Sequence, residues 1–332
     1  MRPWVTRLRL PALLLLLGLA LVLSVRIGSA SLTLRQVLDG IRGIGDPATV
    51  TIVRRLRLPR ALTAVLVGAA LATSGAGFQA LVRNPLADPY ILGVSGGAAL
   101  GAVSAVVLGS ITPAPLSIAA AAFVGALAAI LLVLRIGLAV GPTLDTRVLL
   151  LAGVVVGAFA NASILLLLSF ADLDAFRSAT FWMMGSLSGS SWGGVQALTL
   201  YLIPPLLVLV GLARSLNLIA VGEETAAYLG THVERTKLLV FGAASLLAAA
   251  AVAAAGIIGF VGLIVPHAVR LLWGSDHRFL LPASALLGAT FLLFADMLAR
   301  TVAAPTELPL GAVTALIGVP LFVRLLQRKR PP

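Results

Sequence analysis

Apolar stretches close to 20 residues long recur along the whole chain, and they constrain its fold more than any other feature. A helix needs about 20 apolar residues to cross the hydrocarbon core of a bilayer. The chain is 60% hydrophobic and 11% charged, whereas a soluble domain carries roughly 25% charged residues. We therefore predict an all-α integral membrane protein. A membrane barrel is excluded because its strands show only weak alternation of apolar residues.

The apolar stretches predict about ten transmembrane helices in one domain that spans residues 1–332. The expected segments are 10–27, 61–82, 92–109, 115–135, 147–169, 192–212, 236–256, 257–273, 280–299 and 309–326. The first also fits a signal peptide, because arginines precede it and small residues follow it. Its length favours retention as a membrane span. The eighth is rich in Gly and contains Pro266, which predicts a short or broken helix.

The distribution of positive charge predicts an orientation. With the N-terminus inside, fifteen of the 24 lysines and arginines fall in inner segments and nine in outer ones. The positive-inside rule then places both termini in the cytoplasm. The basic balance is explained in this way, so nucleic acid is not an expected partner. Seven of the nine outer cations nevertheless lie in the first external loop, where the rule predicts few.

Four of these outer arginines lie in the stretch RRLRLPRAL, residues 54–62. They either reach lipid headgroups or face an acidic partner, because a guanidinium pairs with a carboxylate through two parallel hydrogen bonds. Arg300, at the outer end of the ninth segment, extends the same surface. Asp296 lies one helical turn before Arg300 and is placed to orient its guanidinium, or to make only a local contact.

The stretch GVSGG, residues 93–97, matches the G-x-S-x-G pattern of a serine nucleophile, so an intramembrane serine protease is one alternative. Ser95 would be the nucleophile and His267 the base. However, the pattern opens an apolar helix in which glycine recurs at every fourth position from Gly93 to Gly101. That spacing is typical of close helix packing in membranes, which is the favoured interpretation.

Two inner connections and one long inner loop are distinctive. VRNPLADPYILG (82–93) contains two prolines that prevent helix continuation, and GPTLDTR (141–147) has a similar place between the fourth and fifth segments. The loop 214–235 contains a predicted short helix over residues 223–229, with acidic residues in its first turn and Gly230 placed to end it. Such a helix is either an interfacial element or a docking element for a soluble partner.

Several kinds of site are absent from the sequence. No G-x-x-x-x-G-K-[ST] phosphate loop occurs, so the chain lacks that means of binding ATP. No cluster with metal-ligand spacing lies within the predicted spans, and cysteine is absent. Acidic residues are almost missing from the spans, which argues against an ion-coupled secondary carrier, the second alternative. A transport function would therefore draw its energy from outside the chain.

Long blocks of the sequence resemble the FecCD-type permeases, the membrane subunits of type II ABC importers for iron–siderophores, haem and cobalamin. The blocks are residues 57–102 (RLPRALTAVLVGAALATSGAGFQALVRNPLADPYILGVSGGAALGA), 181–189 (FWMMGSLSG), 221–230 (VGEETAAYLG) and 259–322, which begins GFVGLIVPHAVR. The similarity covers nearly the whole chain from about residue 50. Residues 1–50 are not distinctive.

The resemblance implies ten transmembrane helices per subunit, short cytoplasmic coupling helices and location in the inner (cytoplasmic) membrane. It implies a second permease subunit, giving a homodimer or a heterodimer, two cytoplasmic ATPases that hold ATP and magnesium, and a periplasmic binding protein. The permease itself would be neither an enzyme nor the holder of a cofactor.

The resemblance also assigns roles to residues. Docking of the binding protein falls to Arg57, Arg60 and Arg300. Coupling to the ATPases falls to Val221, Gly222, Glu223, Glu224, Ala227, Leu229 and Gly230. The cytoplasmic gate falls to Asn84, Leu86, Asp145 and Thr146.

The cargo is less well defined than the family. An iron chelate, either haem or a ferric siderophore, is the first expectation, and cobalamin is the alternative. Arg177, just before SATFWMMG near the outer mouth, is placed to meet a carboxylate of the cargo or, equally, a headgroup or another group of its loop.

Overall fold

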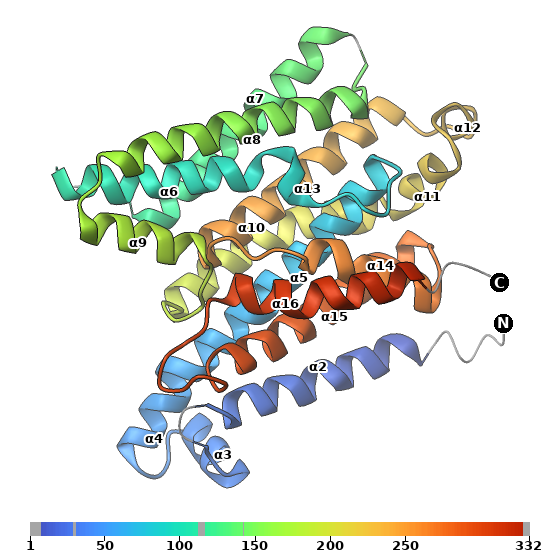
Figure 1. Cartoon of the computed structure of the whole chain (residues 1–332). Coiled ribbons are helices and arrows are strands. Elements are labelled where there is room, and N and C mark those ends of the chain that lie inside the picture. Colours follow the sequence, from blue (N-terminus) through green and yellow to red (C-terminus); the bar gives the residue numbers. More distant parts are fainter. Residues whose placement is uncertain (1–7, 29–30, 112–116, 142, 328–332) are drawn as a thin grey trace.

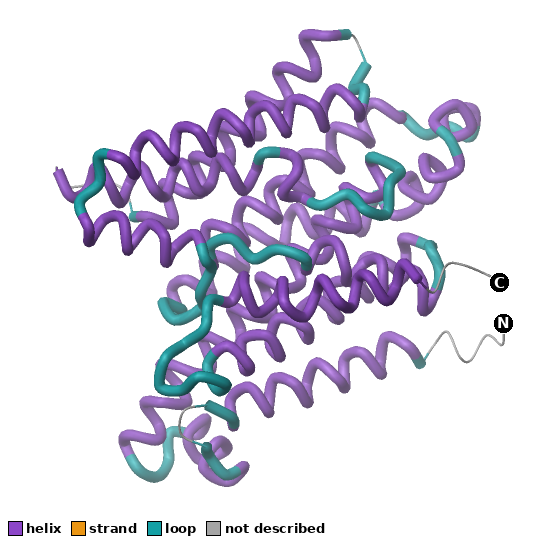
Figure 2. The backbone as a smooth tube through the Cα atoms, viewed as in Figure 1, coloured by secondary structure: helices purple, strands orange, loops and turns teal. Residues whose placement is uncertain are grey.

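The computed structural model describes residues 8–28, 31–111, 117–141 and 143–327. Within these residues every regular element is a helix (Figure 2). The two chain termini, which we placed in the cytoplasm, lie outside the described residues. So do residues 112–116, where the predicted fourth span begins.

Ten helices coincide with the ten predicted spans, so the predicted fold class is confirmed. They are α2 (Arg9–Arg26), α5 (Leu58–Leu81), α6 (Val94–Ile111), α7 (Ile118–Val140), α8 (Thr146–Ser169), α10 (Trp192–Gly211), α13 (Val233–Ala255), α14 (Val261–Trp273), α15 (His277–Ala299) and α16 (Leu310–Gln327). Seven helices of the described chain are long and apolar enough to cross a membrane, and α6, α14 and α16 contribute shorter apolar stretches. The predicted eighth segment becomes the short helix α14, with Pro266 inside it.

Short helices mark the two ends of this bundle. They are α3 (Leu34–Arg42), α4 (Pro47–Thr51), α9 (Leu173–Met183), α11 (Ala213–Val221) and α12 (Glu223–Tyr228). In Figure 1, α3 and α4 lie at one end, and α11 and α12 lie at the opposite end, on the same side of the bundle as the start of α2 and the end of α16. We call these the α3–α4 end and the α11–α12 end. The arginine-rich stretch and the long inner loop are therefore on opposite sides, as expected.

The arginine-rich stretch itself is helical, whereas the sequence pattern predicts that it belongs to the first external loop. A π-helical segment, Ile52–Arg57, follows α4 directly and leads into α5. Pro59 comes immediately afterwards, and it has no backbone N–H to donate to the preceding turn. Wider helical winding beside a residue that interrupts the hydrogen-bond ladder is a recognised way to continue a helix. The arginines are thus held on a continuous helix at fixed angular positions.

Close contacts between small residues build the core of the bundle. A Cβ placed on Gly68 of α5 would lie 2.3 Å from the carbonyl oxygen of Gly288 on α15, and one on Gly75 would lie 1.9 Å from that of Gly262 on α14. On α6, Gly97 and Gly101 meet the α7 backbone at 2.5 and 2.1 Å in the same test. This confirms that the glycine repeat after residue 93 serves helix packing, because any side chain would force the helices apart.

The chain between α13 and α14 is not helical. Gly256 and Phe260 both have positive φ angles, and the backbone N–H of Ser186 donates to the carbonyl of Ala255 at 2.9 Å. The start of α16 joins the same region, since Leu310 N–H donates to Gly185 and Gly311 N–H to Met184. Non-helical backbone inside a membrane bundle is tolerated where it is covered by protein or lines a cavity. These segments form part of the cavity described below.

Candidate functional site

Two of the predicted docking arginines fold back onto the end of α2 instead of projecting outward. Arg57 is 7% exposed and donates from Nη1 to the carbonyl oxygens of Val25 and Arg26 at 2.8 and 2.9 Å. Arg300 is 8% exposed and donates to the backbone carbonyl and the hydroxyl of Ser24. The last carbonyls of a helix have no intrahelical partners and carry partial negative charge. The two guanidinium groups therefore cap α2 and fix it to α5 and α15.

The third arginine, Arg60, holds two carboxylates. Its Nε donates to Asp296 Oδ1 at 2.9 Å, and its Nη1 and Nη2 donate to the two oxygens of Glu307 at 2.6 and 3.0 Å. Asp296, which is 1% exposed, also contacts Arg300 Nε at 3.3 Å. The predicted Asp296–Arg300 pair is confirmed. Asp296 is more than a local helix contact, because it joins two arginines from different helices.

These side chains line a cavity of about 330 Å³ at the α3–α4 end. Its walls include all three arginines, Glu307, Ser188 and Ser190. Three guanidinium groups against two carboxylates leave one net positive charge in a partly desolvated space, which favours an additional anion. The hydrogen bonds from Arg60 lower the pKa of Glu307. The cavity therefore already accommodates a bidentate carboxylate, supplied by the chain itself.

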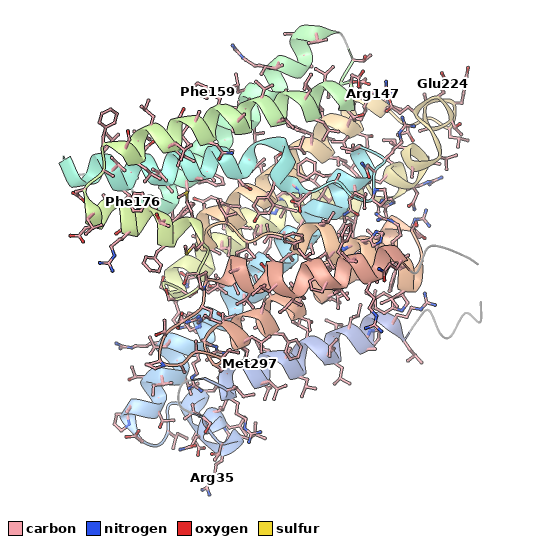
Figure 3. All side chains as sticks on the ribbon, viewed as in Figure 1. Arg35, Arg147, Phe159, Phe176, Glu224 and Met297 are labelled. Carbon is pink, nitrogen blue, oxygen red and sulfur yellow. The ribbon has the colours of Figure 1, made fainter. Side chains whose placement is uncertain are left out.

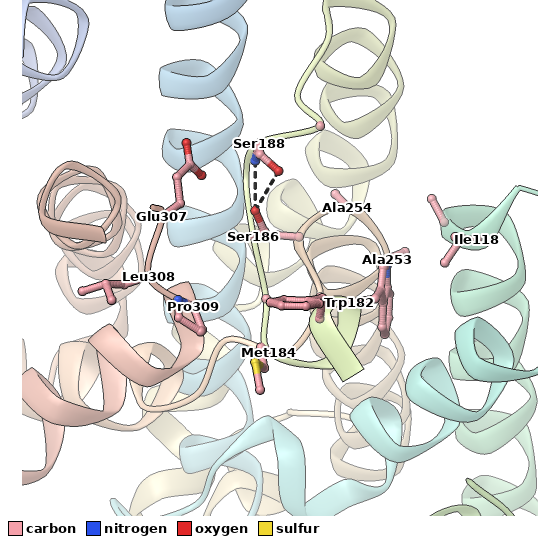
Figure 4. Close-up of a pocket in the computed structure, with 16 residues that line it drawn as sticks. Ile118, Trp182, Met184, Ser186, Ser188, Ala253, Ala254, Glu307, Leu308 and Pro309 are labelled. Carbon is pink, nitrogen blue, oxygen red and sulfur yellow. Dashed lines mark hydrogen bonds between the residues drawn. The ribbon is translucent and has the colours of Figure 1, made fainter. Parts of the chain in front are cut away.

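A larger cavity of about 700 Å³ lies beside the first (Figure 4). It is lined by the end of α9 and the residues that follow, among them Trp182 and Met184, by Ala253–Gly256, and by Glu307–Pro309. The close-up shows Glu307 on one side, Ile118 on the other, and the hydrogen-bonded pair Ser186 and Ser188 between them. Most of this lining is apolar or uncharged. Arg177 is not part of it, since it lies exposed on α9.

The α11–α12 end presents a different surface. Glu223 and Glu224 occupy the first turn of α12, and Gly230 follows the helix in a left-handed conformation, both as predicted. Val221, Tyr228 and Leu229 are exposed apolar side chains here, Tyr228 by 91%. Figure 3 places Glu224 and Arg147 together at this end, far from Arg35. Of the predicted coupling residues, Ala227 is also exposed, and Gly222 joins α11 to α12.

The structure brings part of the predicted gate to the predicted coupling residues. Asp145 and Thr146 line a cavity of about 620 Å³ together with Gly222, Glu223 and Glu224. Asp145 caps α8 by accepting the backbone N–H of Arg147 at 2.8 Å. Asn84 and Leu86 are not in this lining. They form a turn after α5, in which the Asn84 side chain accepts the Leu86 N–H.

In the part of the chain that the structure describes, neither the intramembrane protease nor the ion-coupled carrier gains a site. Ser95 is buried next to Gly157 and Asn161, whereas the His267 ring packs against Phe322. The described residues contain no group of three or more His, Cys, Asp or Glu side chains able to hold a metal ion. Sequence reasoning missed two features that the structure makes prominent. One is Glu307 in the arginine cavity, and the other is a buried lysine, Lys237, beside the cavity at the α11–α12 end.

Comparisons with known proteins extend over nearly the whole chain. A sequence profile described as the FecCD transport family matches residues 14–328. The chain is 48% identical over 288 residues to the cobalamin import system permease protein BtuC of Halobacterium salinarum, covering 86% of this chain and 75% of that protein. It is 40% identical over 325 residues to the hemin transport system permease protein HmuU of Yersinia pestis, covering 98% and 96%.

A solved structure described as an inward-facing conformation of a putative metal-chelate type ABC transporter superimposes with a TM-score of 0.87 at 34% identity. The superposition covers 96% of this chain and 98% of that one.

Proposed function

The chain belongs to the FecCD transport family and is a permease of the ABC-importer type, and we propose that it moves an iron chelate, haem or a ferric siderophore, from periplasm to cytoplasm. The observation that carries the proposal is the separation of two chemically distinct surfaces, a cationic cavity at the α3–α4 end and an acidic and apolar surface at the α11–α12 end. An importer that obtains energy from one partner protein and receives cargo from another needs its two docking surfaces to lie on opposite sides of the membrane.

The α3–α4 end is proposed to face the periplasm and to receive a substrate-binding protein through a carboxylate. Arg57, Arg60 and Arg300 are fixed by helix ends and by Asp296, so their donors are preorganised. The bidentate contact of Glu307 with Arg60 supports the fit, because a carboxylate is already held in this geometry. An incoming acidic side chain would enter the same cavity, next to Glu307 or in its place.

The α11–α12 end of each permease subunit is proposed to dock one cytoplasmic ATPase, so that a permease dimer binds two. Exposed Val221, Tyr228 and Leu229 provide apolar contact area, and Glu224 adds charge at the rim. ATP and magnesium would be bound by those subunits, and the permease would carry out no chemistry. ATP binding favours one arrangement of the ATPases, and docked helices convert that preference into a population shift of the membrane bundle.

Cargo is proposed to pass the region of the larger cavity, whose lining around the ends of α9 and α13 is mostly small and uncharged. Side chains of this kind fit a bulky ligand that is not gripped tightly. The similarity to a hemin permease and to a metal-chelate transporter supports an iron chelate. Cobalamin is the second candidate, favoured by the similarity to a cobalamin permease. Arg177 lies on α9 outside that cavity, and a contact of its guanidinium with the cargo is part of the proposal.

A second permease subunit is proposed to cover part of the apolar surface of this one, and the lipid bilayer to cover the rest. Phe159 of α8 and Phe176 of α9 project from the bundle (Figure 3), and Leu316 of α16 is also highly exposed. A homodimer in the inner membrane, with the termini in the cytoplasm, is the arrangement we propose.

Uptake by reconstituted complexes tests the function. The permease is placed in liposomes with its ATPase inside, and its binding protein is supplied outside with haem, a ferric siderophore or cobalamin. Uptake that requires internal ATP and the binding protein supports an importer, and the transported compound identifies the cargo. Uptake that follows an ion gradient without the ATPase would overturn it.

A further inference from the structure

Lys237 is a buried cation at the α11–α12 end of α13. Its side chain is 4% exposed, and its Nζ donates to Glu223 Oε2 at 2.9 Å and to Glu234 Oε1 at 3.0 Å. Lysine is almost never buried to this extent unless its charge is paired. The two carboxylates come from different elements, since Glu223 begins α12 and Glu234 lies in the first turn of α13. Lys237 therefore binds the two elements together.

The connection continues from Glu234 to the segment before α8. While one oxygen of Glu234 accepts Lys237, the other accepts the backbone N–H of Leu144 at 2.7 Å. Leu144 is buried and directly precedes Asp145, the residue that caps α8. A continuous chain of charge-assisted hydrogen bonds thus runs from the start of α12 through Lys237 and Glu234 to the start of α8. Such bonds are shorter and stronger than neutral ones.

Other attachments of α12 are weaker. Arg83 Nη2 lies 4.0 Å from Glu223 Oε1, and both of these side chains are partly exposed. This six-residue helix has one buried side chain, Ala226, so little apolar packing fixes it. The cavity of about 620 Å³ lies between α12 and residues 143–147, and packing does not fill that space. The preceding helix, α11, is fixed elsewhere, because Asn217 donates to Asp276 Oδ1 at 2.7 Å and accepts the His277 N–H. A displacement of α12 therefore reaches residues 144–146 mainly through Lys237.

We propose that Lys237 is a positioning residue that transmits movement of α12 to the segment before α8. The proposal rests on the proposed function, in which α12 is moved by an ATPase and residues 145–146 gate the pathway. Without the lysine, Glu223 and Glu234 repel each other, and α12 moves without taking Leu144 with it. ATP is then hydrolysed with little transport.

The test compares Lys237→Met with Lys237→Arg and with the control Arg235→Met, in the complete complex of permease, ATPase and binding protein. Arg235 is an exposed cation in the same turn of α13. Both uptake and ATPase rate are measured, and their ratio is the readout. We expect Lys237→Met to lower transport per ATP by about tenfold, inside the roughly 5- to 150-fold range typical of coupling between sites. Lys237→Arg retains most of the ratio, and Arg235→Met is unchanged.

A distance measurement makes the test independent of folding yield. The native chain has no cysteine, so spin labels are introduced at Thr143 and Thr225, which line the same cavity. We expect one narrow distance distribution that is retained with and without ATP in the native background, and a broad one in Lys237→Met. An unchanged transport-to-ATPase ratio in Lys237→Met, including one that results from an equal loss of both rates, would overturn the coupling role. A narrow distance distribution in Lys237→Met would overturn it as well. A native complex without ATP-driven uptake would instead refute the proposed function.

Discussion

Replacing Asp296 by alanine should loosen one end of the molecule and leave the other intact. Asp296 is 1% exposed and contacts Arg60 at 2.9 Å and Arg300 at 3.3 Å. At an effective dielectric constant near 20, a pair of unit charges about 4 Å apart attracts by roughly 4 kcal/mol. Desolvation offsets part of this attraction. Removal of one partner from a buried pair nevertheless costs about 3–5 kcal/mol, because the remaining charges stay buried without compensation.

In the Asp296→Ala variant, Glu307 is the one carboxylate left beside Arg60, and it is more exposed than Asp296. Arg300 keeps its hydrogen bonds to Ser24 and loses its carboxylate partner. The weakened region comprises the junction of α2, α5 and α15 and the turn that follows α15. Its amides include that of Leu308, which donates to Ala299 at 2.8 Å. If opening of this region becomes easier by about 3 kcal/mol, protected amides there exchange with solvent roughly 100-fold faster.

Hydrogen exchange followed by mass spectrometry, on protein in lipid nanodiscs, measures this effect by segment. We expect faster exchange in residues 300–310 and at the end of α2, and no change in α12 and the start of α13. Asp174→Ala, which removes an exposed carboxylate from the first turn of α9, is the control and should leave both regions unchanged. Equal acceleration at both ends, or none at the α3–α4 end, would refute the assignment of Asp296 as the centre of the arginine network.

Three further predictions concern packing, pH and cargo. Gly75→Ala places a methyl group 1.9 Å from a backbone oxygen and should lower the free energy of unfolding by about 1–3 kcal/mol, measured by thermal unfolding. The control Gly242→Ala, with open space around it, should be neutral or stabilising in that assay. The pKa of Glu307 is lowered from 4.5, chiefly by hydrogen bonds from Arg60. Its stabilising contribution is therefore complete above pH 4.5 and is lost as the pH falls through the lowered pKa. In Glu307→Gln, acid should no longer accelerate hydrogen exchange in residues 300–310, and an acid response equal to that of the native chain would show that Glu307 is not its cause. Arg177→Ala should reduce uptake of a carboxylate-bearing cargo such as haem while leaving docking of the binding protein intact, and full haem uptake by this variant would reject a cargo contact.

The long apolar segments could be predicted from the sequence, because crossing a bilayer requires length and hydrophobicity that a local pattern reveals. The glycine spacing from Gly93 to Gly101 also predicted close helix packing correctly, since few other residues allow two helices to approach so closely. Helix α9 was missed. It has 11 residues and carries charged side chains, so it gives no signal of a span.

The placement of the arginines could not be predicted, because it depends on contacts between distant parts of the chain. Arg57 is buried against the carbonyl groups at the end of α2, and the Val25 carbonyl that it contacts is 32 positions away in sequence. Glu307 reaches Arg60 across 247 positions. The sequence distinguishes Lys237 from other inner cations in no way, since its partner Glu223 belongs to a helix whose position no local pattern gives. The residues of a surface can be recognised from sequence, but their mutual pairing requires the fold.

The central claim is that the arginine cavity and the α11–α12 surface face opposite sides of the membrane. Single-cysteine variants test it directly, because the native chain has no cysteine. Arg55 is an exposed residue near the cavity, and Tyr228 is 91% exposed at the other end. A thiol reagent that cannot cross the membrane should label Arg55→Cys in intact spheroplasts, and Tyr228→Cys only after the membrane is opened. Labelling of Tyr228→Cys in intact spheroplasts, with Arg55→Cys protected until lysis, would contradict the account.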